Sequence, residues 1–125
     1  MSMARTITIE TAYLEALEFT DCGPDDPERA NAPWSEALFT HAEAEAVRFI
    51  NSLPPTLWAE VSEAVEMGRY SWRQFGHDLW FTRNGHGTGF WDRGLAMLGD
   101  DLSDHAHAMG EVWTYVTDNG ELDIA

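Results

Sequence analysis

Residues 76–94 read GHDLWFTRNGHGTGFWDRG, and this stretch decides the expected fold of the second half of the chain. Two short runs rich in aromatic and aliphatic side chains, residues 78–83 and 88–93, flank the turn-forming sequence NGHG (residues 84–87). Aromatic residues are enriched in strands, and an Asn-Gly pair between two such runs is a strong signal for a β-hairpin. The stretch therefore predicts two antiparallel strands joined by a tight turn.

The expected hairpin pairs side chains that attract one another across the two strands. With Gly85 and His86 as the turn residues, aromatic side chains lie opposite aromatic ones and an acid lies opposite a base. Such cross-strand pairs each stabilise a sheet by roughly 0.2–1 kcal/mol. The opposed residues are Arg83 and Thr88, Phe81 and Phe90, Trp80 and Trp91, and Asp78 and Arg93.

The first half of the chain has the periodicity of amphipathic helices, and Gly, Pro and Asn mark its interruptions. The chain ends in alternating polar and apolar residues around an Asn-Gly pair, which predicts a second hairpin. We expect helices over residues 8–19, 34–53, 56–67 and 100–109, a loop over 20–33, and the second hairpin over 112–124. The predicted fold is α+β, a single domain over residues 1–125 in which N-terminal helices pack on a small antiparallel sheet built from two C-terminal hairpins.

Length and composition are typical of one folded domain. The chain has 125 residues, and the 44% that are hydrophobic provide enough apolar surface to offset the entropy of ordering it. No apolar run reaches the roughly 18 residues of a membrane-spanning helix, and the N-terminus lacks the pattern of a secretion signal. The single cysteine, Cys22, cannot form an internal disulfide, which fits a reducing compartment. We therefore expect a cytoplasmic protein without membrane association.

The chain is strongly acidic, with 22 Asp and Glu residues against seven arginines, no lysine, and a formal net charge of −15. Residues 1–68 carry a net −10 and residues 100–125 a net −7, whereas residues 69–99 carry a net +2. Such a field repels nucleic acids and anionic lipids, whose binding depends on Lys and Arg. The expected partner is therefore a basic or nucleic-acid-binding protein, or a cation, and the expected assembly is a monomer or a small homo-oligomer. An acidic surface that serves only solubility is the alternative.

Many of the acidic residues lie in the predicted helices, where they can form rows on the solvent-facing sides. Duplex DNA carries about one negative charge per 1.7 Å of its axis, so spaced rows of carboxylates can imitate its phosphates. A random, solvated arrangement of the same side chains is the alternative. The residues of this candidate surface are Glu36, Glu43, Glu60, Glu63, Glu66, Asp100, Asp101 and Asp104.

The string over residues 76–94 resembles GHDFWLTRNGHGAGFWDRG, a sequence found in a family of small proteins encoded by bacteriophages and other mobile elements. The chain departs from that form at Leu79, Phe81 and Thr88, and all three changes are conservative. Weaker similarity extends to Tyr13-Leu14-Glu15, Gly110-Glu111, Tyr115-Val116 and Asp118-Asn119-Gly120. The resemblance implies no activity. It implies a genetic context in which small acidic proteins are often inhibitors of host nucleic-acid machinery.

The same stretch offers a different kind of candidate site, built from the residues of the expected hairpin. His86 lies between two glycines, where a ligand can approach the backbone closely. Arginine and tryptophan side chains nearby could form a stacking platform for a planar group. The alternatives are that the glycines serve turn geometry alone and that Arg93 pairs with Asp78 or Asp92. The candidate binding residues are Arg83, Asn84, His86, Trp91 and Arg93.

One group of metal-binding residue types lies in and after the predicted helix near residues 100–109. Asp104, His107 and Glu111 are spaced i, i+3 and i+7, so one helix face would present imidazole and carboxylate ligands together. The sequence contains no HExxH or CxxC pattern, and a solvated helix face is the alternative. No nucleophile–base set is recognisable, so no catalytic residue is identified, no cofactor is expected and an enzymatic role is disfavoured.

Two functional hypotheses result from these observations. The first is a small, phage-type protein that inhibits a host protein, for example one of antiviral defence, by binding it through the acidic surface and imitating DNA. The second is a small domain that binds a ligand or a metal at the hairpin over residues 76–94. A structural accessory domain without a site is a third interpretation.

Overall fold

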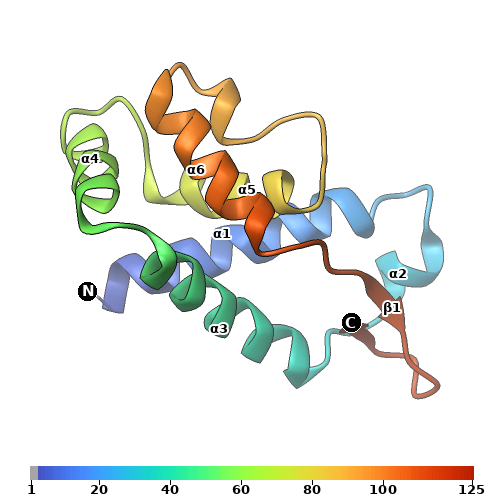
Figure 1. Cartoon of the computed structure of the whole chain (residues 1–125). Helices are drawn as coiled ribbons and strands as arrows, with labels where there is room; N and C mark the ends of the chain where they lie inside the picture. Colours follow the sequence, from blue (N-terminus) through green and yellow to red (C-terminus); the bar gives the residue numbers. More distant parts are fainter. Residues whose placement is uncertain (1–2) are drawn as a thin grey trace.

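The computed structural model describes residues 3–125 and has the predicted α+β class. Within these residues the chain forms six α-helices, one 3-10 helix and a two-stranded antiparallel sheet near the C-terminus (Figure 1). The elements are α1 (Met3–Asp21), α2 (Pro27–Asn31), α3 (Glu36–Ser52), α4 (Pro55–Glu66), α5 (Trp72–Arg83), η1 (Phe90–Asp92), α6 (Met97–Ala108), β1 (Thr114–Val116) and β2 (Leu122–Ile124).

The central motif forms a helix and a loop, so the predicted hairpin over residues 78–83 and 88–93 is wrong. Helix α5 is capped by Ser71, whose side-chain oxygen accepts a hydrogen bond from a backbone N–H in the first turn. Phe75 and Leu79 are both fully buried, and their four-residue spacing is that of one helix face. Helix α5, which contains several of the aromatic residues that suggested strands, packs against α1, α6 and η1. This tertiary packing overrides the β propensity of the aromatic residues.

The sheet therefore contains one hairpin where two were predicted. The hairpin expected over residues 112–124 is confirmed, with β1 and β2 antiparallel and Val116 opposite Leu122. Backbone hydrogen bonds attach it to the segment before α3, because the Leu122 N–H donates to the Pro33 carbonyl and the Ser35 N–H donates to the Leu122 carbonyl. The helices bury their apolar faces against one another, so no second hairpin is needed to bury them.

The helices predicted over residues 8–19, 34–53, 56–67 and 100–109 are confirmed as α1, α3, α4 and α6, with shifted ends. The predicted loop over residues 20–33 contains the short helix α2. This helix starts at a proline that follows a capping aspartate, and both residues favour a helix start over a loop.

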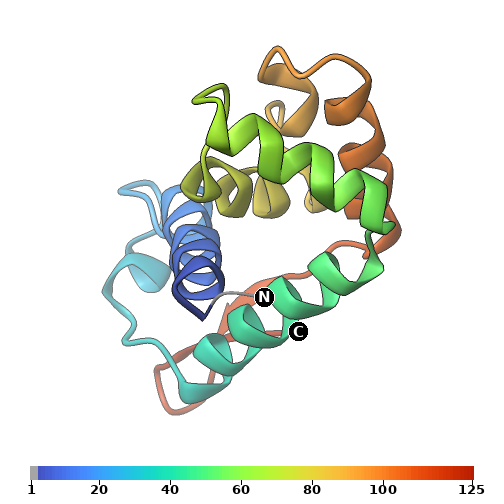
Figure 2. The ribbon, with the colours of Figure 1, turned by 90° about the vertical axis from the view of Figure 1, so that its left-hand side faces the viewer.

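Helix α1 packs between α5 and α3, and Figures 1 and 2 show these neighbours on opposite sides of it. The rings of Phe49 in α3, Phe75 in α5 and Phe90 in η1 form a cluster with centroids 5.5–5.7 Å apart. All three side chains are fully buried. Because Phe90 belongs to this cluster, the loop that follows α5 is held against the helices.

Candidate functional site

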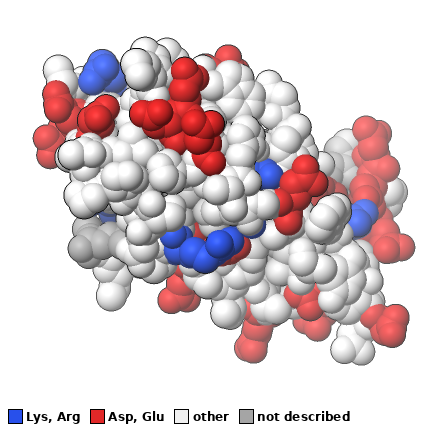
Figure 3. Space-filling model, in the orientation of Figure 1, with Lys and Arg blue, Asp and Glu red and all other residues white. Residues whose placement is uncertain are grey.

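Six of the eight acidic residues in the candidate surface lie on two neighbouring helices, α4 and α6. Their side chains are exposed, and acidic atoms gather in Figure 3 over the upper left of the molecule, where these helices lie in Figure 1. Glu60, Asp101 and Asp104 line one hollow of about 290 Å³. Across residues 3–125, none of the six forms an ion pair. We call Glu60, Glu63, Glu66, Asp100, Asp101 and Asp104 the α4–α6 acidic face.

The carboxylates of the α4–α6 acidic face are closely spaced. Glu60, Glu63 and Glu66 are three residues apart on α4, and each step along a helix of this kind advances about 4.5 Å. The phosphates of one DNA strand are about 3.4 Å apart along the duplex axis. The acidic residues of α6 extend the surface across the hollow between the helices. The face therefore covers roughly the length of two to three base pairs.

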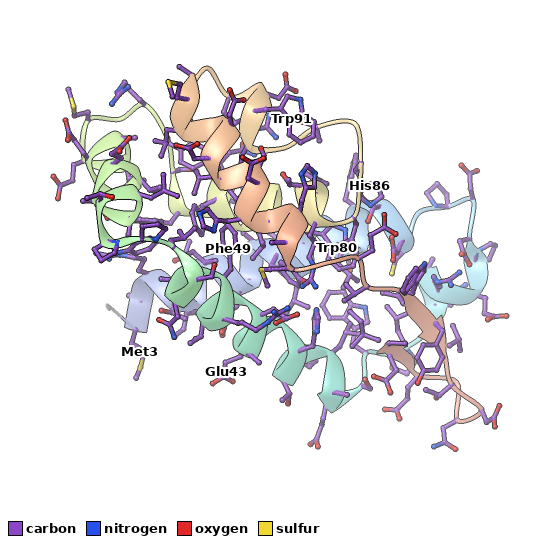
Figure 4. All side chains as sticks on the ribbon, viewed as in Figure 1. Met3, Glu43, Phe49, Trp80, His86 and Trp91 are labelled. Carbon is purple, nitrogen blue, oxygen red and sulfur yellow. The ribbon has the colours of Figure 1, made fainter. Side chains whose placement is uncertain are left out.

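The other two residues of the candidate surface, Glu36 and Glu43, lie on α3 and do not belong to this face. Figure 4 shows Glu43 on the lower side of the molecule, whereas α4 and α6 lie at the top. Both side chains are exposed. Six of the eight acidic residues thus lie on α4 and α6 and two lie on α3, so the candidate surface is divided.

A groove between α1 and α3 forms a further acidic region that the sequence analysis did not identify. It has a volume of about 320 Å³ and combines carboxylates with apolar side chains. The pattern that could have revealed it is Glu10, Leu14 and Glu18, which recur every four residues and so share one face of α1. We call this the α1–α3 groove, lined by Glu10, Thr11, Leu14, Glu15, Glu18, Trp34, Phe39, Ala42 and Glu43.

Among the motif residues, Arg83 is part of the protein interior, with 3% of its surface exposed. Its Nη1 donates to Glu45 Oε1 at 2.9 Å and to the Tyr13 hydroxyl at 3.2 Å. Its Nε donates to the carbonyl of Gly110 at 2.9 Å, and its Nη2 donates to that of Met109 at 3.2 Å. The guanidinium joins α1, α3, α5 and the segment after α6, and these contacts leave it unavailable to a ligand.

Glu45 is the charged partner of Arg83, and it also accepts hydrogen bonds from Arg48 at 2.6 and 3.0 Å. Burial alone would raise the pKa of Glu45, but the hydrogen bonds and charges of the two arginines outweigh it and lower that pKa to about 2. Burial also lowers the pKa of His41, whose Nε2 lies 2.8 Å from the Tyr13 hydroxyl. The network is therefore built from an ionised Glu45 and a neutral His41 near neutral pH.

Replacing Glu45 by glutamine should lower the free energy of unfolding by about 1–2 kcal/mol at pH 7, because the amide oxygen still accepts from Arg83 but carries no charge. The folded-state pKa lies below the ordinary value of 4.5, so the ionised carboxylate stabilises the fold above that pH. The contribution disappears as the pH falls towards 2. Urea unfolding of both proteins measures it, and the difference between them should be smaller at pH 3 than at pH 7. An equal difference at both would contradict the assignment.

Arg93 is paired with Asp78, as the alternative to a ligand-binding role predicted, although the two residues meet between a helix and a loop. Asp78 is fully buried and accepts from Arg93 Nη2 at 2.8 Å, from the Tyr70 hydroxyl at 2.5 Å and from Gln74 Nε2 at 3.0 Å. Burial and the charge of Asp78 raise the pKa of Tyr70 well above its ordinary value. This ion pair fixes the end of the motif against α5.

The remaining motif residues divide between two places. Asn84 and His86 line a hollow of about 520 Å³ beside the end of α1, whereas Trp91 lies outside it, with its ring against Gly89. Figure 4 shows His86 and Trp91 well apart. Asn84 is structurally engaged, because its Nδ2 donates to the Trp80 carbonyl and its Oδ1 accepts from the backbone of the segment before β1. The five predicted binding residues therefore do not form one site.

The predicted metal ligands are separated by the fold. Helix α6 ends at Ala108, and the chain turns at Gly110 with a φ of 77°. As a result Asp104 lines the hollow between α4 and α6, whereas Glu111 lines the hollow that contains His86. Across the described residues 3–125, no three His, Cys, Asp or Glu side chains are placed to hold a metal ion.

Comparisons with protein-family models, with curated proteins and with solved structures find no match to this chain. Across residues 3–125, no helix has the length and apolar character required to cross a membrane.

Proposed function

We propose that this protein binds a basic, nucleic-acid-binding protein through the α4–α6 acidic face and occupies part of the surface with which that protein holds DNA. The observation that carries the proposal is the exposure of six carboxylates on two neighbouring helices, three of which line one hollow and none of which forms an ion pair within residues 3–125. Five of the seven arginines are in ion pairs with other acidic residues, and the remaining positive charge beside this face includes Arg69, which is exposed three residues beyond the end of α4.

The charge of the whole protein supports the same partner class. A formal net charge of −15 attracts a basic surface over distances of about a Debye length, roughly 10 Å at 0.1 M salt, and repels nucleic acid. A basic protein that binds DNA already presents Lys and Arg at the spacing of phosphates. Acidic residues that follow one another at about 4.5 Å along the axis of α4 match this requirement approximately. The resulting complex would be formed quickly and weakened by salt.

The resemblance of residues 76–94 to small proteins of bacteriophages supports a host protein as the partner. An acidic protein that occupies the DNA-binding surface of a host defence protein would act as an inhibitor in the host cytoplasm, without catalysis. In this proposal the motif has a structural role. Its two buried charges, Arg83 and Asp78, hold α5 and the following loop in place. Helix α6 packs against α5, and α4 packs against α6.

Ligand binding in the hollow of about 520 Å³ is a second candidate function, favoured by the position of His86 in its wall. The size is within the range of small-molecule sites, which are typically about 300–1,000 Å³. Glu111 and Asp25 are further charged residues of the same lining. A ligand at this place would be small and cationic or hydrogen-bonding, and its binding would depend on these three side chains and not on α4 or α6.

Affinity capture from a bacterial lysate tests the proposed function. The immobilised protein should retain one or more basic proteins at low salt and release them when duplex DNA or concentrated salt is added. A variant with four neutralised acids on the α4–α6 acidic face should retain no more than about a tenth as much. Asp100 and Asp101 are left in place because acids in the first turns stabilise a helix. The substitutions are Glu60→Gln, Glu63→Gln, Glu66→Gln and Asp104→Asn.

A control variant with the same change in net charge distinguishes binding by the α4–α6 acidic face from binding in the hollow that His86 lines. It carries neutral residues at four acidic positions outside the α4–α6 acidic face, two of which line the hollow with His86. Capture should be unchanged by this variant. Equal loss in both variants, or retention that duplex DNA does not reverse, would contradict the proposed function, and loss in the control alone would favour the hollow. The control substitutions are Asp25→Asn, Glu111→Gln, Asp118→Asn and Glu121→Gln.

A further inference from the structure

The α1–α3 groove combines an apolar floor with an exposed aromatic wall. Leu14 and Ala42 are buried among its lining residues. Phe39 is 52% exposed and packs against Trp34 with ring centroids 5.7 Å apart. Partly exposed aromatic side chains beside an apolar hollow are typical of surfaces that bind another protein, since aromatic residues are enriched at interfaces. The groove therefore offers apolar area that a partner can bury.

The α1–α3 groove holds four carboxylates, of which Glu15 is paired with Arg73 at 3.2 Å. Partial burial, followed by the charge of Glu43 in α3, raises the pKa of Glu10 in α1. Glu18 lies about two turns farther along α1. Across residues 3–125, none of the other three carboxylates forms an ion pair. A cation placed in the groove would remove the repulsion between Glu10 and Glu43, so the groove is complementary in charge to Lys and Arg.

The order of residues along α1 specifies the shape of the partner. Glu10, Leu14 and Glu18 lie at four-residue intervals, so an acidic, an apolar and an acidic position follow one another over about 12 Å. A basic amphipathic helix presents the complementary order at the same interval. We propose that the α1–α3 groove binds such a helix of a partner protein. Its apolar side chain would contact Leu14 and Phe39, and its Lys or Arg side chains would lie at the surrounding carboxylates.

Other occupants do not have this complementarity. Nucleic acid and anionic lipid would bring phosphates towards the carboxylates of the groove. A second copy of the chain would need an exposed basic helix, but five of the seven arginines are in ion pairs. A sixth, Arg5, lies over the rings of Trp58 and Trp72. The expected partner is therefore a different protein with a basic amphipathic segment.

This inference rests on the proposed function, because the helix is expected to belong to the same basic partner. The two surfaces act in different ways. The α4–α6 acidic face acts through charge alone, which salt screens. The α1–α3 groove also selects the position of an apolar side chain, which salt does not screen. A segment that combines positive charge with an apolar side chain at the right position would bind more tightly than a protein that is only basic.

The test uses a synthetic helical peptide of about 16 residues with leucines along one face, lysines flanking that face and neutral polar residues opposite. Fluorescence anisotropy of the labelled peptide measures its affinity for the whole protein at low salt and at about 0.5 M NaCl. NMR of ¹⁵N-labelled protein locates the binding site. We expect saturable binding with the largest shifts on α1 and α3, and partial persistence of binding at high salt.

Two double variants with the same change in charge decide whether the groove is the site. Glu10→Gln/Glu43→Gln should weaken peptide binding at least about tenfold, whereas Glu63→Gln/Glu66→Gln should change it less than about twofold. The first pair should not damage the fold, because it removes a repulsion between carboxylates. Phe39→Ser should weaken binding at both salt concentrations, since it removes apolar contact and leaves the charges unchanged.

Equal weakening by the two double variants, or equally tight binding of a peptide with scrambled leucines, would overturn the inference in favour of unspecific attraction to an acidic protein. Largest NMR shifts on α4 and α6 would have the same consequence. The outcome is separable from that of the capture experiment. If no basic protein is captured but the peptide still binds the groove specifically, only the proposed role of the α4–α6 acidic face is contradicted. If capture succeeds but the peptide does not bind the groove specifically, only the inference about the groove is contradicted.

Discussion

Replacing Arg83 by leucine should lower the free energy of unfolding by about 3–5 kcal/mol, a large part of the stability of a domain of this size. Arg83 is 3% exposed, and its guanidinium donates to Glu45, to the Tyr13 hydroxyl and to the carbonyls of Met109 and Gly110. Leucine would leave the carbonyls of Met109 and Gly110 without this donor, and it would remove one of the two arginines that donate to Glu45. Each unsatisfied buried polar group costs on the order of 1–3 kcal/mol, and the loss of one of the two cations beside the ionised Glu45 adds to this cost.

Urea unfolding followed by circular dichroism measures this loss, and Arg73→Leu is the matched control. Arg73 is largely exposed and pairs with Glu15 at the surface, so its replacement should leave the unfolding midpoint unchanged within error. Arg83→Lys should fall between the two, because an ammonium group keeps the charge but cannot reproduce the fork of the guanidinium. If Arg83→Leu costs no more than Arg73→Leu, the buried network does not stabilise the fold.

Replacing Gly76 by alanine should destabilise the protein by about 2 kcal/mol or more, although alanine is the better helix former. Gly76 lies within α5, and helix propensity alone predicts a gain of about 1 kcal/mol from the substitution. A Cβ at this position would overlap the carbonyl oxygen of Ile9 and would lie 2.7 Å from the Cβ of Ala12. Both atoms belong to α1, and a backbone oxygen cannot move aside as a flexible side chain can. The two helices would have to separate, and the steric cost exceeds the gain in propensity.

Gly87→Ala is the control for this prediction, because a Cβ at Gly87 would have no atom within 4 Å. That substitution should leave stability unchanged or raise it slightly, since alanine restricts the unfolded chain. The thermal midpoints of the two variants, compared with the parent protein, give the result. A Gly76→Ala protein as stable as the parent would mean that α1 and α5 are packed less closely than described here.

Both predictions concern residues of the 76–94 motif, and both assign it a role in packing. Gly76 allows the approach of α1, Arg83 joins four segments, and Arg93 neutralises the buried Asp78. His86 is the member of the predicted binding set that lines a hollow and has no side-chain hydrogen bond among those described in residues 3–125. The acidic surfaces on the helices around the motif are therefore the main candidates for partner binding.

The hairpin over residues 78–93 could not be distinguished from a helix by composition. Aromatic residues at positions such as Trp80 and Phe81 favour strands locally, and NGHG is a frequent turn sequence. The deciding contacts are distant in sequence. The indole N–H of Trp80 donates to Thr20 at 2.8 Å, and Gly76 lies against Ile9. The pairing of Asp78 with Arg93 was predicted correctly, because the two opposite charges attract whether residues 78–83 form a strand or a helix.

Sequence alone determined the features that depend on neighbours along the chain: the helical segments of the first half, the C-terminal hairpin, the α+β class and the strong negative charge. Periodicity, capping residues and turn residues act locally, so they can be recognised without a structure. The tertiary structure alone decided which charges are buried and which acids converge. Arg83 could face solvent or Glu45, and Glu60 could lie near Asp104 or far from it, because burial and charge clustering depend on how α1, α3, α4, α5 and α6 pack together.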